Sequence, residues 1–364
     1  MNARIMATPL QTGGPVLVES KRPEGPERAS PTPNKARRVR ALADALGVVR
    51  ILALDHEASL ERQLRARGPA NNSDVVAFKR LILDALTTSV SGVVLDPVSF
   101  LACKASIPPA VGVLLKAEQS WMAVTSAGDR ITVVNPEWTV ARIAETGADG
   151  VKLMLYYHPD GTPEVLGRQR ELAQEIGELC AQFELAFVLE PIGYPLPDDE
   201  RGDGEAAEAN RARRRPGVVV ESAAEFARSR YRADLIKIDF PVDLRYVDVY
   251  SARFGNSRRP IYDLPAVRRT CRSLARSCDV PWVLMSSGAS NGEFTEYVRL
   301  GVEAGASGFI CGAALWSPAV ERYPDKLGIE QALVGECRQN LVNIEDALSA
   351  ARPPQGTSHL AGRP

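Results

Sequence analysis

Short apolar runs alternate with amphipathic stretches from about residue 37 to residue 350. Each run is four to eight residues long and is bounded by polar residues, glycine or proline, which is typical of buried parallel strands. The eight runs are VVRILALD, GVVLD, VGVLLK, GVKLMLYY, LAFVLE, DLIKID, PWVLMSS and GFICG, and they end at Asp55, Asp96, Lys116, Tyr157, Glu190, Asp239, Ser287 and Gly312.

The stretches between most of these runs carry apolar residues three and four positions apart, as amphipathic helices do. The segment 74–87 places Val75, Phe78, Leu81 and Ile82 on one face. The segments 163–183, 218–231, 263–276 and 292–304 show the same pattern. Eight strands alternating with helices favour an α/β protein with a (β/α)8 TIM barrel. A doubly wound, Rossmann-like sheet is the alternative, and it is disfavoured because no strand leads into a GxGxxG turn.

Three segments fall outside this alternation. Residues 1–36 and 351–364 are rich in proline, glycine and charge and lack apolar periodicity, so we expect a flexible leader and a flexible tail around a single barrel domain of residues 37–350. The third segment, 195–217, is a charged excursion after the fifth strand. We expect a loop above the carboxyl ends of the strands, either a lid or a plain insertion.

Composition narrows the class of protein. The chain has 44 Lys and Arg against 45 Asp and Glu, a formal charge of −1, which argues against a general nucleic-acid binder. No apolar run approaches the ~18 residues of a membrane span, and no signal-peptide core follows the N-terminus. The six cysteines form no CxxC pair and have no histidine cluster beside them, so neither zinc nor a disulfide framework is expected. A cytoplasmic enzyme fits these features.

The active site of such a barrel lies where the strands end, so charged residues inside apolar strands are informative. Lys237 lies among Leu235, Ile236 and Ile238. A buried lysine either pairs with a carboxylate, for which Glu190 is the candidate here, or loses its proton and becomes a usable nucleophile. The local sequence leaves both interpretations open.

Three further strand residues complete a candidate catalytic set. Lys152 would be a second ammonium that lowers the pKa of Lys237. Glu190 would move protons, and Asp55 would hydrogen-bond a substrate hydroxyl. For each residue alone, an ion-pair or capping role is equally compatible with the sequence.

The last two strands end in small residues whose backbone N–H groups could hold a phosphate, although such residues also occur in plain turns. These candidate substrate-binding residues are Ser286, Ser287, Gly288, Gly312 and Ala313. His56, next to Asp55, could contact the substrate.

From Val48 to Ala319 the chain resembles the tagatose-1,6-bisphosphate aldolase family and its sulfofructose-phosphate aldolase relatives. The motifs that carry the resemblance are ALDHE, LDP, AETGADGVKLMLYY, FVLEPI, LIKIDFPVDLRYV, SSGAS and GASGFICGAALW. The resemblance implies that Lys237, in K-[VI]-[ED]-x-P, forms an imine with the substrate, and that Lys152, Glu190 and Asp55 assist it. This chemistry requires no metal and no organic cofactor.

The chain departs from the family pattern at two positions. Glu57 stands where the family has the arginine of DQR, and Ala313 stands where it has the arginine of GRAxW. The loss of two guanidinium groups removes anion clamps, and Glu57 would repel a second phosphate. A monophosphate, a deoxy sugar, or an uncharged or cationic aldehyde is therefore favoured over a hexose bisphosphate. Arg245, Arg258, Arg259 and the arginines of segment 195–217 are candidate replacements.

The sequence thus predicts a class I aldolase that cleaves or forms a ketose or ketose phosphate, with a donor of the dihydroxyacetone phosphate type. Two alternatives stay open: a biosynthetic imine-forming lyase or condensing enzyme, and a catalytically silent regulatory barrel. The expected partner is a small sugar or sugar phosphate rather than nucleic acid or a membrane. A homo-oligomer is compatible with the sequence.

Overall fold

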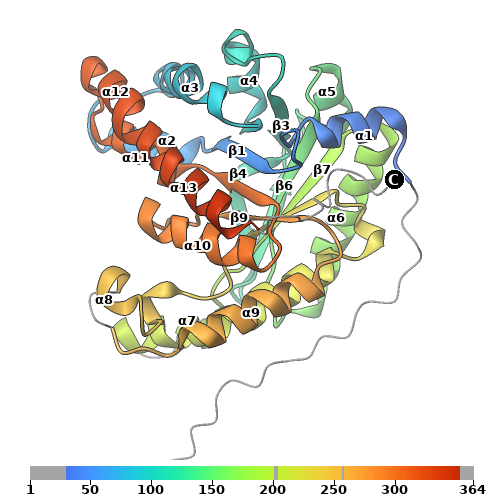
Figure 1. Cartoon of the computed structure of the whole chain (residues 1–364). Coiled ribbons are helices and arrows are strands. Elements are labelled where there is room, and N and C mark those ends of the chain that lie inside the picture. Colours follow the sequence, from blue (N-terminus) through green and yellow to red (C-terminus); the bar gives the residue numbers. More distant parts are fainter. Residues whose placement is uncertain (1–29, 201–203, 256–257, 353–364) are drawn as a thin grey trace, which may run out of the picture.

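A closed barrel of eight parallel strands forms the centre of the molecule (Figure 1). The computed structural model describes residues 30–200, 204–255 and 258–352. Around the barrel the strands follow the order β1-β10-β9-β8-β7-β6-β3-β2, which confirms the predicted fold. They are β1 (Val49–Leu54), β2 (Gly92–Leu95), β3 (Gly112–Lys116), β6 (Gly150–Tyr156), β7 (Ala186–Ile192), β8 (Leu235–Asp239), β9 (Trp282–Met285) and β10 (Gly308–Cys311).

Helices cover the outside of the barrel (Figure 1). The longer ones are α3 (Asn72–Leu86), α6 (Pro163–Gln182), α7 (Gly204–Phe226), α9 (Leu264–Ser277), α10 (Asn291–Glu303) and α13 (Arg338–Ala351). The shorter ones are α1 (Pro33–Arg40), α2 (Ala58–Arg65), α4 (Pro97–Cys103), α5 (Val140–Glu145), α8 (Ser251–Phe254), α11 (Ala313–Glu321) and α12 (Lys326–Ala332). Local sequence fixes where two of these helices begin. Asn71 and Asp74 form a capping box at α3, and Ser290 and Glu293 form one at α10. Each box satisfies backbone N–H groups that the first turn of the helix leaves free.

Alternate strand residues face opposite sides of the sheet. The barrel therefore has two separate cores, one between the strands and the helices and one inside the barrel. The residues of one parity point outward and pack against the helices. The other parity fills the barrel interior with an apolar layer made of Val49, Ile51, Ala53, Val94, Leu114, Ala186, Val188, Leu235, Val283 and Ile310. The next inward positions along several strands are charged, and they form the site described below.

An antiparallel hairpin that the sequence analysis did not predict lies between β3 and β6. Its strands are β4 (Glu118–Val124) and β5 (Arg130–Val134). Thr132 Oγ1 accepts a hydrogen bond from the Tyr156 backbone N–H at 2.9 Å, which fixes the hairpin to the end of β6. The hairpin therefore forms one wall of the barrel mouth.

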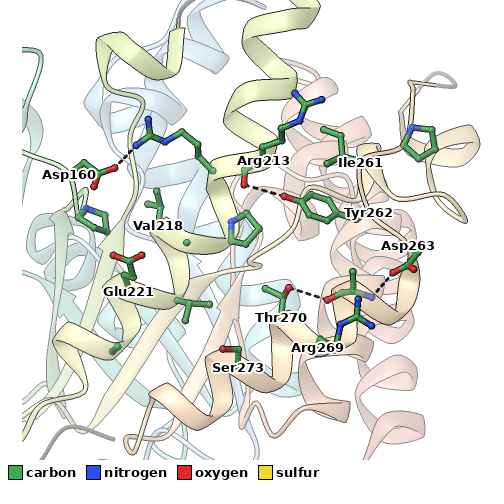
Figure 2. Close-up of a pocket in the computed structure, with 18 of the residues that line it drawn as sticks. Asp160, Arg213, Val218, Glu221, Ile261, Tyr262, Asp263, Arg269, Thr270 and Ser273 are labelled. Atoms are coloured by element: carbon green, nitrogen blue, oxygen red, sulfur yellow. Dashed lines mark hydrogen bonds and ion pairs between the residues drawn. The ribbon is translucent and has the colours of Figure 1, made fainter. Parts of the chain in front are cut away.

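The expectation of a loop over residues 195–217 is wrong for its second half, because α7 begins at Gly204. Pro216 lies inside α7 and cannot donate a hydrogen bond to the carbonyl of Ala212. The Tyr262 hydroxyl, from the segment before α9, lies 3.2 Å from the carbonyls of both Ala212 and Arg213 and shares its one proton between them. Figure 2 shows the bond to Arg213. Tyr262 thus stabilises a helix that proline would otherwise interrupt.

The predicted leader ends earlier than residue 36. Helix α1 starts at Pro33, and Lys35 is buried and pairs with Asp234 at 3.0 Å. After α1, the carbonyl of Ala41 lies so close to Gly112 that a Cβ there would be 2.3 Å away, so this segment packs directly on the start of β3. Residues 1–29, and the tail from residue 353, lie outside the described residues.

Candidate active site

Strand alternation brings the four candidate catalytic residues together inside the barrel. Lys237 is two residues beyond Leu235 of the interior layer, and Glu190 is two beyond Val188. Lys152 and Asp55 have the same inward parity on β6 and just after β1. The Nζ atom of Lys237 lies 2.7 Å from Glu190 Oε1, and its side chain is 7% exposed. Lys237 therefore points into the barrel and not among the helices.

Lys152 is surrounded by carboxylates. Its Nζ lies 2.5 Å from Glu118 Oε1, 2.7 Å from Asp55 Oδ2 and 3.2 Å from Glu190 Oε2. Burial alone would lower the pKa of Lys152, but these three carboxylates raise it well above its usual value. Burial also acts to raise the pKa of Asp55, yet Lys152 and Lys237 hold it well below the usual range. At neutral pH the site thus contains a permanent ammonium and an ionised carboxylate.

Glu190 bridges the two lysines. Its Oε1 faces Lys237, while Oε2 is near Lys152 but accepts no hydrogen bond from any residue in the described part of the chain. This oxygen is therefore available to a substrate or to a transferring proton.

Glu118 is a member of the site that the sequence analysis missed. It is 3% exposed and starts β4 of the hairpin. Besides its bond to Lys152, its Oε2 accepts the backbone N–H of Met154 at 3.0 Å. The signal was present in the sequence: two alternating runs, SWMAV and RITVV, flank the turn residues TSAGD, a hairpin pattern.

The expectation that Glu57 would repel an anion needs correction. Glu57 Oε2 forms an ion pair with Lys116 and accepts the Ser120 hydroxyl at 2.6 Å, and Lys116 also donates to Ser120 at 2.8 Å. The lysine at the end of β3 therefore compensates the negative charge at the end of β1. Arg62 of α2 also lines the cavity.

His56 is held close to the last strand. Its ring contacts Trp316 edge-on at 5.6 Å, and its Cε1 atom would lie 2.7 Å from a Cβ at Gly312. A residue other than glycine at position 312 would therefore place its Cβ against the His56 ring. Burial lowers the pKa of His56, although Asp55 acts to raise it, so the imidazole is neutral at physiological pH.

The small residues after the last two strands lie together on one wall. Ser286, Ser287, Gly288, Gly312 and Ala313 all line the cavity. Gly312 is also the N-cap of α11, and no side chain caps this helix. Backbone N–H groups at an uncapped helix N-terminus suit an anion. The other suggested replacements, Arg245, Arg258 and Arg259, are absent from the described residues that line the cavity.

The cavity at the mouth has a volume of about 320 Å³. Among the described residues its lining holds four cationic and four anionic side chains, namely Arg62, Lys116, Lys152, Lys237, Asp55, Glu57, Glu118 and Glu190. A larger groove of about 760 Å³ runs between α7 and α9 (Figure 2). It lies outside the barrel, and no lysine in the described part of the chain lines it. The chemistry therefore belongs to the smaller cavity.

In the described ranges, no group of three or more His, Cys, Asp or Glu side chains is arranged to hold a metal ion. Asp55, Glu118 and Glu190 do converge, but the cation between them is the Lys152 ammonium. Over the same ranges, no helix is both long enough and apolar enough to cross a membrane.

Residues 49–318 match the family model described as DeoC/LacD family aldolase. The chain belongs to this family. It is thus an enzyme of the lyase class with the predicted barrel. Among similar curated proteins, tagatose 1,6-diphosphate aldolase 2 of Enterococcus faecalis is 27% identical over 84% of this chain and 90% of its own length. The tagatose 1,6-diphosphate aldolase of Streptococcus agalactiae is 29% identical over 81% and 89%.

Solved aldolase structures share the fold of this DeoC/LacD member. An archaeal fructose 1,6-bisphosphate aldolase aligns with a TM-score of 0.52 and 18% identity, covering 82% of this chain and 98% of the other. Another solved structure, of an archaeal fructose-1,6-bisphosphate aldolase with its catalytic lysine bound to a carbinolamine intermediate, aligns with a TM-score of 0.53 and 17% identity, covering 85% and 99%. At these identities the likeness concerns the barrel alone.

Proposed function

We propose that this DeoC/LacD aldolase acts by imine chemistry, with Lys237 as the residue that bonds to the substrate ketone. The observation that carries the proposal is the 2.7 Å contact between Lys237 Nζ and Glu190 Oε1 inside a closed barrel, next to the Lys152 ammonium. A buried amine with an adjacent carboxylate and a neighbouring cation has the parts that carbonyl condensation needs.

The first half of the reaction forms the imine. Glu190 accepts a proton from Lys237, and the free amine attacks the ketone carbon of the substrate. Lys152 remains an ammonium and donates a hydrogen bond to the carbonyl oxygen as negative charge develops there. Glu190 then returns its proton to the carbinolamine oxygen, takes up one proton from the nitrogen and passes it to the same oxygen, which leaves as water, and a protonated imine remains.

The second half breaks the C3–C4 bond. A carboxylate removes the proton of the C4 hydroxyl, C4 leaves as the aldehyde, and the bonding electrons move to the imine as an enamine. Asp55 is ionised and lies beside Lys152 at 2.7 Å, so it can hold this hydroxyl or act as the base. Protonation at C3 and hydrolysis release the ketone donor and regenerate Lys237.

We propose a donor of the dihydroxyacetone type. Its terminal oxygen or phosphate would lie at Ser287, Gly288 and the N-terminus of α11, where backbone N–H groups replace the missing guanidinium. The aldehyde would face Glu57, Lys116 and the hairpin. This end differs from the family pattern, so we propose an altered acceptor specificity.

Donor proton exchange tests imine chemistry without knowledge of the aldehyde. Dihydroxyacetone phosphate and dihydroxyacetone are each incubated with the protein in D2O and followed by NMR. Enamine formation exchanges a C3 proton of the donor, and we expect exchange with the wild-type protein and none with Lys237→Ala of unchanged circular dichroism. Exchange that persists in Lys237→Ala, or wild-type protein inert toward both ketones, would contradict the proposal.

A further inference from the structure

The chain turns sharply directly after β9. The Ala289 backbone N–H donates to the Ser286 carbonyl at 2.8 Å, and the two central residues have positive φ, +47° at Ser287 and +81° at Gly288. This is the geometry of a type I′ β-turn. Gly288 adopts it without steric cost. Ser287 does not, because the left-handed conformation costs a residue with a Cβ about 1–2 kcal/mol.

A carboxylate anchors the strained serine. The Ser287 hydroxyl donates to Asp239 Oδ1. Asp239 is the last residue of β8 and lies two positions after Lys237, on the same inward face. Its side chain is only 14% exposed, so it is a fixed acceptor rather than a mobile surface group.

Arg215 of α7 contacts the same carboxylate oxygen as Ser287. Its Nη2 lies 3.7 Å from Asp239 Oδ1, and its Nε donates to the carbonyl of Phe240 at 2.8 Å. The guanidinium is thus bonded to the backbone next to Asp239, and it partly offsets a negative charge close to a wall that is expected to receive an anion.

The turn lies at the cavity and carries backbone donors. Ser287 and Gly288 both line it, and the backbone N–H groups of these two residues have no acceptor in the part of the chain that the structure describes. Two unused N–H groups in successive left-handed residues are well placed for an oxygen of a ligand. Their direction depends on the φ angle that Ser287 keeps.

We propose that Asp239 is a positioning residue, which holds Ser287 in the left-handed conformation so that the turn receives the anionic end of the donor ketone, with Arg215 keeping Asp239 in place. The inference rests on the proposed aldolase function, since it concerns the donor end of that site. Asp239 does not touch the reacting atoms. Its removal therefore acts on the binding of phosphorylated donor and not on the chemistry at Lys237.

Four variants test this role by the proton-exchange rates of both donors. Asp239→Ala should raise KM for dihydroxyacetone phosphate about tenfold, because the binding-competent turn becomes a minor state, with kcat and the KM for dihydroxyacetone nearly unchanged. Asp239→Asn keeps an acceptor oxygen and should stay within about twofold. Asp279→Ala, an exposed aspartate just before β9, is the matched control.

The decisive variant is Asp239→Ala combined with Ser287→Gly. Glycine needs no anchor to adopt positive φ, so the double variant should recover most of the lost affinity for dihydroxyacetone phosphate. An unchanged KM in Asp239→Ala, or a double variant no better than Asp239→Ala alone, would overturn the inference. If only this inference fails, every variant still exchanges the protons of dihydroxyacetone. If the imine proposal itself fails, no variant exchanges the protons of either ketone.

Discussion

The ammonium of Lys152 is the structural centre of the site, and Lys152→Met tests this directly. Methionine has a similar length but leaves Asp55, Glu118 and Glu190 facing one another without the cation that lies 2.5–3.2 Å from each. Breaking a buried ion pair costs about 3–5 kcal/mol. For roughly 320 ordered residues, an unfolding entropy of about 2.1 cal/mol/K per residue converts this into an apparent Tm lower by roughly 5–7 °C at pH 7.5.

The loss of stability in Lys152→Met should depend on pH, and the pKa shift of Asp55 determines whether this loss grows or shrinks on acidification. In the wild-type protein the pKa of Asp55 is held well below its usual value, so this carboxylate stabilises the fold above the unfolded pKa, and the stabilisation is lost as the pH falls through the folded pKa. Lys152→Met removes the cation that lowers this pKa most, so we expect burial, the largest cause, to raise the pKa of Asp55 above its unfolded value although Lys237 remains. The variant then gains stability on acidification, and its Tm deficit should narrow from pH 7.5 to pH 5.5.

Lys79→Met is the matched control. Lys79 is also fully buried, and it lies 2.5 Å from a single carboxylate, Asp96, between α3 and β2 outside the barrel. Both variants should lose stability at pH 7.5, but only Lys152→Met should lose donor exchange. The reasoning is refuted if Lys152→Met melts with the wild-type protein at pH 7.5, or if its deficit stays constant down to pH 5.5.

Three further predictions concern the surroundings of the site. Glu118→Gln removes one charge beside the permanent ammonium and should slow donor exchange about tenfold by loss of a charge-assisted hydrogen bond; an unchanged rate by NMR would exclude a role for the hairpin carboxylate. Tyr262→Phe leaves the Ala212 carbonyl without its donor and should lower the free energy of unfolding by about 1 kcal/mol, with faster proteolysis at the start of α7; equal urea midpoints and cleavage rates would argue against it. Glu57→Gln releases Lys116 from its ion pair and should lower KM severalfold for phosphorylated aldehydes only, and added salt should weaken this effect. An equal change in KM for unphosphorylated aldehydes would contradict the idea that Glu57 neutralises the charge of Lys116.

Strand alternation explains how much of the site the sequence could predict. Lys237 and Glu190 are each two positions past an interior apolar residue, and this period of two carries their inward direction in the sequence itself. The family resemblance then selected these residues among the strand-end charges. Asp96 had a similar place at a strand end, yet it pairs with Lys79 outside the barrel and caps α4. Whether a residue at a strand end points into the barrel or toward the helices depends on packing between distant segments, which cannot be seen in the sequence.

The remaining errors concern partners that come from distant segments. Glu57 gave no sign of its pairing with Lys116, since the two residues meet only after β1, β2 and β3 curve around the barrel. Segment 204–217 contains a proline and many charges, so local propensity favoured a loop. A hydroxyl from Tyr262 changes that balance. Long-range contacts of this kind override local preference.

The most direct test of the central claim is reduction of the imine. The protein is incubated with dihydroxyacetone phosphate or dihydroxyacetone, treated with borohydride and digested, and the peptides are analysed by mass spectrometry. The account predicts a reduced donor adduct on Lys237, absent without ketone and lost in Lys237→Ala. An adduct on Lys152 or Lys116 in place of Lys237, or no adduct under conditions where the protein turns over substrate, would contradict it.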